Sequence, residues 1–205
     1  MIRTEIDSNI RAGKLEEMLI TVPRAIVVNK FNEEAAYKFN RELNEAKNSR
    51  QPVIPVIIDS YGGEVYSLLS MVDAIHNVEN IPVATIITGK SMSCGAVLFS
   101  QGTEGYRFMA PNSTLMIHDV SAGALGKTEE INANAKEVTR LNDLIYELMA
   151  KGSGKKDPKY FWKLVHQQGR ADWYLTSQEA KKHNLANHLY LPSLKIKINY
   201  SVDFG

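Results

Sequence analysis

Short apolar runs along the chain alternate with longer segments in which apolar positions recur every three or four residues. Three of these runs, residues 25–28, 53–58 and 83–88, are rich in β-branched side chains, which favour strands. Helical patterns follow the first two runs, and residues 65–78 form the clearer of the two. Strand followed by helix, repeated along the chain, predicts right-handed crossovers and a largely parallel sheet with helices outside it.

Polar and small residues mark the boundaries of these predicted elements. Asn32 precedes Glu33 and Glu34, an arrangement that caps a helix and suits its dipole. Pro55 interrupts the second run, which indicates an edge strand or a bend near the strand start. Ser93 follows the third run and a short turn, so we expect a helix to begin there.

The second half of the chain predicts two further strands, residues 107–109 and 114–117, and then a long helix over about residues 129–150. At about 1.5 Å per residue this helix is about 30 Å long. Its apolar stripe either packs on the chain's own core or projects towards another subunit, and periodicity alone leaves both interpretations open.

Three weaker signals follow this helix. Asp157-Pro158 predicts a helix start, and Thr176 with Glu179 forms a capping box before another short helix. Residues 195–200 alternate polar and apolar positions, which fits an edge strand or a loose terminus.

Composition places the chain among ordinary globular proteins. It has 205 residues, 44% hydrophobic and 23% charged, with a net charge of +1, so we expect neither nucleic-acid nor membrane binding. The single cysteine, Cys94, permits no internal disulfide and favours a reducing compartment. The first 18 residues do not read as a secretory signal, and no apolar run approaches the ~20 residues of a membrane span. The expectation is a cytoplasmic protein.

Candidate chemistry centres on one serine. Ser93 is followed by the small residues Gly95 and Ala96, and backbone N–H groups at a helix start can bind an anion. Its alternative role is that of a simple helix cap. His118 ends an apolar run and is either a base or an ordinary strand-end histidine. Gly62-Gly63 is either a tight turn or a place where bare backbone meets a ligand.

Several ordered motifs together resemble the ClpP family, the proteolytic subunits of the Clp protease. The resemblance covers residues 25–189 and implies the ClpP/crotonase-like α/β fold, with repeated ββα units, a mostly parallel sheet, outer helices and a projecting handle helix. The motifs are Asp59-Ser60-Tyr61-Gly62-Gly63, Gly89-x-x-x-Ser93-x-Gly95-Ala96, Pro111-Asn112-Ser113, Met116-Ile117-His118 and the segment ADWYLTSQEA at residues 171–180.

The resemblance implies a serine endopeptidase with the triad Ser93, His118 and Asp172, as nucleophile, general base and orienting acid. Backbone N–H groups of Gly63 and Cys94 would form the oxyanion hole. The residues Ser121 and Gly123 would pair with an extended substrate backbone. No metal or cofactor is expected.

The same resemblance implies that the site is hidden inside an assembly. We expect one domain over residues 1–205, with a divergent N-terminal segment (1–23), a handle (119–152) and a C-terminal tail (190–205). Seven copies would close a ring, two rings would stack, and an AAA+ unfoldase would supply unfolded chains.

The chain also departs from the family pattern. Asp119-Val120 replaces the usual Gln-Pro after the histidine, and without the proline we expect a looser substrate strand. Because neighbouring strand residues face opposite ways, Asp119 should not replace Asp172, although its charge can raise the pKa of His118. Ala171 stands where the family often has an arginine that helps link the rings, and Arg170 comes one residue earlier.

Four alternatives stay open. A catalytically silent ring subunit is disfavoured because all three triad positions are intact. A crotonase-like acyl-CoA enzyme would use glutamates and a CoA pocket. A ClpP-like protease that matures viral capsids fits the unusual N-terminus. In the fourth alternative Cys94 rather than Ser93 is the nucleophile, which thiol-blocking reagents would test.

Overall fold

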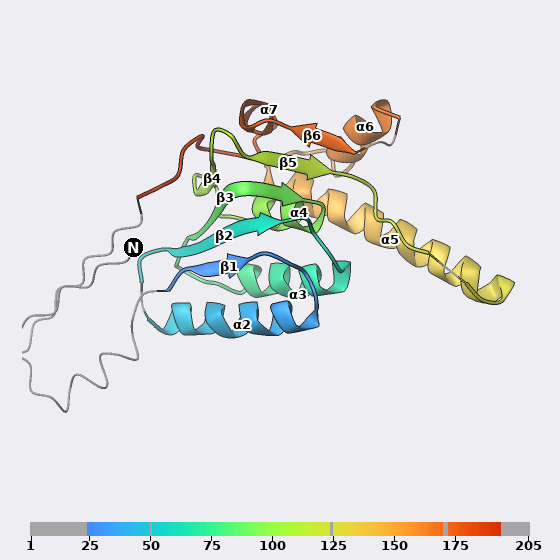
Figure 1. Ribbon diagram of the computed structural model, residues 1–205, viewed down its shortest axis with the longest axis horizontal. Helices are drawn as coiled ribbons and strands as arrows, with labels where there is room; N and C mark the ends of the chain where they lie inside the picture. Colours follow the sequence, from blue (N-terminus) through green and yellow to red (C-terminus); the bar gives the residue numbers. More distant parts are fainter. Residues whose placement is uncertain (1–23, 50, 124, 170–171, 194–205) are drawn as a thin grey trace, which may run out of the picture.

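A computed structural model of the chain describes residues 24–49, 51–123, 125–169 and 172–193, arranged as one sheet with helices packed on it (Figure 1). The strands are β1 (Ile26–Val28), β2 (Ile54–Ser60), β3 (Val83–Met92), β4 (Arg107–Met109), β5 (Thr114–Ile117) and β6 (Trp173–Leu175), and the helices are α2 (Glu33–Asn48), α3 (Val65–His76), α4 (Cys94–Ser100), α5 (Thr128–Gly152), α6 (Tyr160–Gln167) and α7 (Ser177–Lys182). The predicted N-terminal segment and the strand at 195–200 lie outside these residues.

The sheet has the order β1-β2-β3-β5-β6, and β4 also pairs with β3. All pairs are parallel except β5–β6, which is antiparallel. The expected mostly parallel α/β sheet is therefore confirmed. β2 lies between β1 and β3, so the suggestion from Pro55 that it is an edge strand is wrong. Pro55 is tolerated because pairing with β1 begins only at Val56, one residue after the proline.

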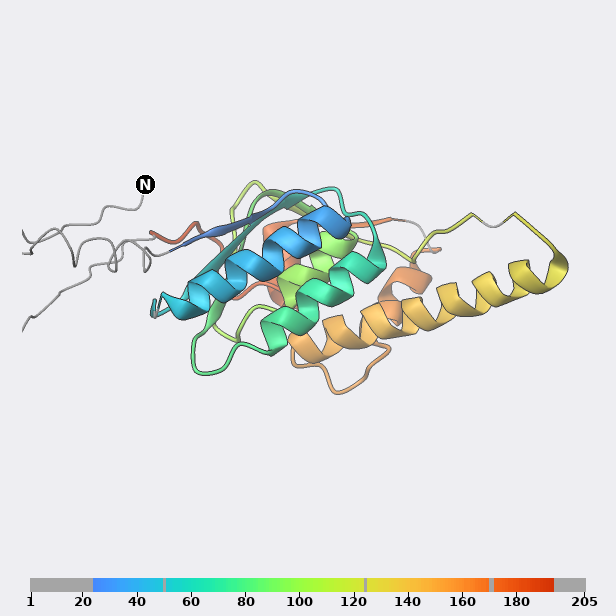
Figure 2. The ribbon, with the colours of Figure 1, turned by 90° about the horizontal axis from the view of Figure 1, so that it is seen from below.

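Helices α2, α3 and α4 and the second half of α5 cover one face of the sheet, as seen from below in Figure 2. Their buried residues join those of β1, β2 and β3 in one hydrophobic core. The predicted cap of α2 is confirmed, since the Asn32 side chain accepts a hydrogen bond from the Ala35 N–H at 2.9 Å. The capping box of Thr176 and Glu179 at α7 is confirmed as well. Helix α6 begins at Tyr160, two residues later than Asp157-Pro158 suggested.

Helix α5 combines the two interpretations of its apolar stripe. Its buried residues lie in the second half, where it packs on the core. The first half extends away from the rest of the described chain (Figures 1 and 2), and its residues are exposed up to Lys136. Its 25 residues correspond to a length of about 37 Å. The buried residues are Leu141, Ile145, Tyr146, Met149 and Ala150.

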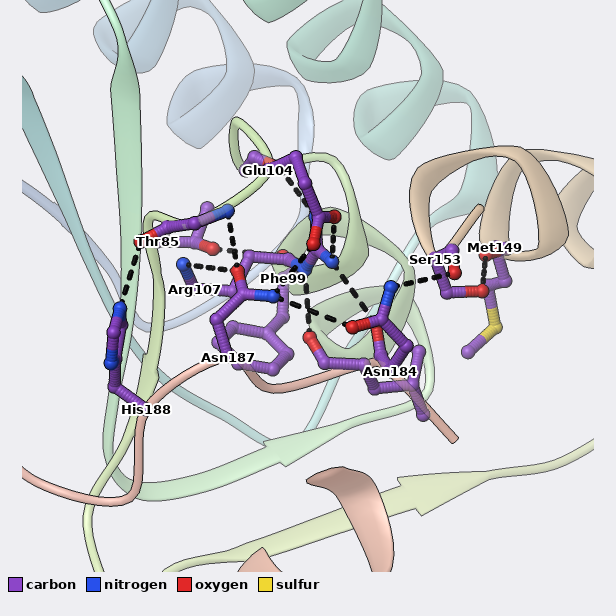
Figure 3. A network of polar contacts seen from close by, with 12 residues as sticks. Thr85, Phe99, Glu104, Arg107, Met149, Ser153, Asn184, Asn187 and His188 are labelled. Atoms are coloured by element: carbon purple, nitrogen blue, oxygen red, sulfur yellow. Dashed lines mark hydrogen bonds and ion pairs between the residues drawn. The ribbon is translucent and has the colours of Figure 1, made fainter. Parts of the chain in front are cut away.

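A buried arginine fixes the segment after α7 to β4 (Figure 3). The fully buried Arg107 donates to the carbonyl oxygens of Gly102 at 3.0 Å, Leu185 at 2.9 Å and Asn184 at 3.1 Å. It also forms an ion pair with Glu104, whose carboxylate is largely exposed. Three main-chain carbonyl oxygens thus accept hydrogen bonds from a guanidinium that would otherwise be costly to bury.

Within the described residues, none of the helices combines the length and the apolar character that crossing a membrane requires.

Candidate active site

Ser93 lies at the turn between β3 and α4, where the sequence placed it. β3 pairs with β5 up to Met92 opposite Met116, and the Ser93 N–H donates to the Met116 carbonyl oxygen at 2.9 Å. Ser93 has φ 54° and ψ −120°, a conformation that serine rarely adopts and that costs about 1–3 kcal/mol. The sharp turn holds the serine at the start of α4, and such strain is common at functional sites.

The loop after β2 brings bare backbone against this serine. A Cβ on Gly62 would lie 2.8 Å from the Ser93 Cβ, and one on Gly63 would lie 2.3 Å from the Phe31 carbonyl oxygen. Both glycines have positive φ, of 105° and 151°. Gly62 thus brings bare backbone close to Ser93, and Gly63 packs against the backbone of Phe31.

Cys94 lies directly beside Ser93 and is 3% exposed. Its Sγ donates to the carbonyl oxygen of Gly63 at 3.2 Å. Burial raises the pKa of this thiol, which opposes the formation of a thiolate. This environment argues against the alternative in which Cys94 is the nucleophile.

His118 and Asp172 meet because β5 and β6 are antiparallel. Ile117 pairs with Trp173, so the next residue after β5 lies beside the residue before β6. Nδ1 of His118 is 3.4 Å from Oδ1 of Asp172. Ser93 and His118 are both described and both line one cavity, but they are not hydrogen-bonded to each other. Catalytic hydrogen bonds are often loose without substrate and tighten when it binds.

The cavity has a volume of about 240 Å³. Ser93, His118, Gly63 and Cys94 all contribute to its wall. The remaining wall is mostly apolar and comes from the loop after β2, from α3, α4 and α5, and from the segment after β5. These lining residues are Tyr61, Val65, Leu68, Val97, Val120, Ser121 and Ile145. Ser121 therefore lies at the cavity, whereas Gly123 is exposed and does not line it.

The residues after His118 are held by contacts that the sequence did not reveal. Asp119 points to Tyr146 and His166, 2.8 Å and 3.1 Å away, and so does not replace Asp172. The Val120 N–H donates to Oδ1 of Asn142 at 2.6 Å. The Val120 amide, which a proline would lack, is hydrogen-bonded here, and this contact opposes the loosening expected from loss of the family's proline.

The fold, with a serine at a strained strand–helix turn beside a histidine and bare glycine backbone, defines a serine peptidase. The chain belongs to the Clp protease family, whose model matches residues 8–191. One curated relative is the ATP-dependent Clp protease proteolytic subunit of Deinococcus radiodurans. It is 35% identical over 147 residues, which cover 72% of this chain and 69% of the relative. The family decides against the crotonase-like acyl-CoA alternative.

Proposed function

We propose that this Clp-type serine peptidase is an endopeptidase that cleaves unfolded chains or peptides through Ser93, His118 and Asp172. One observation carries the proposal: Ser93, His118 and the backbone of Gly63 and Cys94 line a single cavity, and Asp172 lies beside His118. These residues come from separate elements and supply the nucleophile, the base and the donors that acyl transfer requires.

In the first half of the reaction, Nε2 of His118 takes the proton of the Ser93 hydroxyl as Oγ attacks the scissile carbonyl. Asp172, next to Nδ1, orients the imidazole and stabilises its charged form. The N–H groups of Gly63 and Cys94 donate to the oxyanion. His118 then gives its proton to the leaving amine, and Ser93 keeps the acyl group. Water hydrolyses this ester with His118 as base again.

The wall of the cavity supports a preference for an apolar side chain at the residue whose carbonyl is attacked. Val65, Leu68 and Val97 line the same cavity as Ser93, and burying an apolar side chain against them is favourable. The exposed residues Ser121 and Gly123 follow the cavity and supply main-chain groups for an extended substrate. Such backbone pairing suits unfolded polypeptide and demands little of its sequence.

The exposed first half of α5 supports a handle between stacked rings, since an isolated helix with few buried contacts gains stability from a partner. In this proposal residues 1–205 form one domain, seven copies close each ring around the Ser93 cavities, and an AAA+ unfoldase delivers chains. The name of the Deinococcus radiodurans relative, an ATP-dependent protease subunit, supports the unfoldase.

The test is covalent labelling of the purified protein with a fluorophosphonate, read by intact mass and peptide mapping. We expect one label on Ser93, lost in Ser93→Ala and greatly slowed in His118→Ala and Asp172→Ala. Cys94→Ala is the control for a thiol nucleophile and should retain labelling at Ser93. Absence of label in protein that forms rings by native mass, with an unfoldase added, would contradict the proposal and indicate a silent subunit. Co-purification with a capsid protein instead would favour the capsid-maturation alternative.

A further inference from the structure

Beyond the proposed triad, on which this inference rests, we propose that Asp119 is a positioning residue. Its carboxylate, held by Tyr146 of α5 and His166 of α6, fixes the strand end that carries His118. Asp119 itself does not touch the reacting atoms, and it acts through the main chain of its neighbour.

The contact with Tyr146 is buried on the tyrosine side, and the tyrosine is its donor. The Tyr146 side chain is 1% exposed, and its hydroxyl donates to Oδ1 of Asp119 at 2.8 Å. Burial and the neighbouring carboxylate raise the pKa of Tyr146. The phenol therefore stays a donor, and a charge-assisted hydrogen bond of this kind is shorter and stronger than one between neutral groups.

His166 holds the same carboxylate from the second helix. Its Nε2 is 3.1 Å from Oδ2 of Asp119 and 3.4 Å from Oδ1. The imidazole packs on the indole of Trp162, with ring centroids 4.0 Å apart, and its side chain is 15% exposed. The ring is thus fixed by packing as well as by the hydrogen bond. Side chains from two helices, α5 and α6, thus converge on one carboxylate.

The next residue is tied to the same helix as Tyr146. The Val120 N–H donates to Oδ1 of Asn142 at 2.6 Å, and Val120 lines the catalytic cavity. Asn142 and Tyr146 are four residues apart and share a face of α5. Asp119 and Val120, the two residues after His118, are therefore both anchored on α5, whose first half projects from the domain.

These contacts hold His118 from one side while the sheet holds it from the other. Ile117, which precedes His118, pairs with Trp173 of β6. Without Asp119, His118 would lose one of these anchors and would keep the strand pairing, the hydrogen bond of the Val120 amide and the contact of its Nδ1 with Asp172. A small displacement of a catalytic base lowers the rate steeply, whereas substrate binding in the cavity is affected less.

The test compares Asp119→Ala, Asp119→Asn and Tyr146→Phe with Tyr66→Phe as matched control. Tyr66 also donates to a carboxylate of α5, that of Glu137 at 2.7 Å, but this bond is exposed and Glu137 is not part of the segment after β5. For Asp119→Ala we expect the rate of fluorophosphonate labelling and kcat for a peptide to fall about tenfold or more, with KM changed far less. Asp119→Asn should recover part of this loss, because its amide oxygen still accepts from Tyr146. Tyr66→Phe should match the wild type.

Equal labelling rates and kcat in wild type, Asp119→Ala and Tyr146→Phe would overturn the inference, even if the melting temperature falls. If Asp119→Ala fails to fold, Tyr146→Phe, which removes one oxygen atom, decides.

If the wild type does not label, the proposed function fails, and histidine-selective NMR tests the inference separately. With five histidines in the chain, the His118 signals can be assigned, and they should shift or broaden in Tyr146→Phe but not in Tyr66→Phe. Unchanged His118 signals in Tyr146→Phe would overturn the inference.

Discussion

Gly63→Ala is the sharpest test of the oxyanion hole. A Cβ at this position would lie 2.3 Å from the Phe31 carbonyl oxygen, whereas real Cβ atoms essentially never come closer than 3.0 Å to such an atom. The obstacle is backbone, and Phe31 is bound in turn because its carbonyl oxygen accepts the Glu64 N–H at 2.9 Å. The loop must therefore move by about 0.7 Å or more, taking the Gly63 N–H with it.

The size of the effect follows from this displacement. Removing one oxyanion donor typically costs about 10²–10³ in kcat, and a 1 Å misplacement costs about 10². We therefore expect Gly63→Ala to lower kcat about a hundredfold. The rate of fluorophosphonate labelling should fall as well, because the phosphonyl oxygen uses the same donors. The assay is steady-state cleavage of a peptide together with the labelling time course.

Gly105→Ala is the matched control. Gly105 also has a positive φ, of 84°, but a Cβ there meets no atom within 4 Å. It should cost about 1–2 kcal/mol of stability through backbone strain and leave kcat unchanged. If Gly63→Ala folds and keeps kcat within about threefold of wild type, the N–H of Gly63 is not a donor to the oxyanion and the reasoning fails.

Three further predictions concern the surroundings of the site. Arg107→Met should remove about 3–5 kcal/mol of stability and lower the melting temperature by about 10 °C, because three carbonyls lose a buried donor. Glu104→Gln changes a mostly exposed carboxylate and should cost less than about 1 kcal/mol. Similar losses in thermal melting for the two variants would refute the structural role given to Arg107. Cys94→Ser, which leaves the chain without a thiol, should keep Ser93 labelling and peptide cleavage, and loss of both would revive the thiol alternative. Burial, and then the charge of Lys155, lower the pKa of His183. The unfolded chain therefore takes up the proton first, and stability should decrease as pH falls below about 6.5. The melting temperatures of wild type and His183→Asn, plotted against pH, should converge at acidic pH, and parallel plots would contradict this.

The central strands of the fold follow from the sequence because most residues of β2 and of the first half of β3 are buried, which gives continuous apolar runs. β4 and β5 have the predicted bounds, and β3 starts where predicted. It runs on to Met92, four residues further than predicted, because residues 89–92 add pairing with β5 and Ser60 but little apolar signal. β6 has three residues, too few for an alternation to appear, and only the resemblance drew attention to that segment.

Local sequence patterns likewise predict one part of the candidate site and miss the other. His118 ends an apolar run, and Ser93 follows one after a few small and polar residues, so local patterns place both near strand ends. The approach of Asp172 depends on the antiparallel pairing of β5 with β6, which no local pattern encodes. The partners of Asp119 were not foreseen because Tyr146 and His166 lie 27 and 47 residues further along, on helices whose packing decides which side chains face the strand. Covariation between positions 119 and 146 in related sequences would have revealed the contact.

The hydrogen bond from the Val120 amide to Asn142 has an evolutionary consequence. Proline at position 120 would delete the donor and leave a half-buried amide oxygen unpaired, so the proline of the family and the asparagine anchor are mutually exclusive solutions. A lineage cannot pass from one to the other by a single neutral substitution. Positions 119, 120, 142, 146 and 166 should therefore change as a block, and relatives that carry valine at 120 should carry an acceptor at 142.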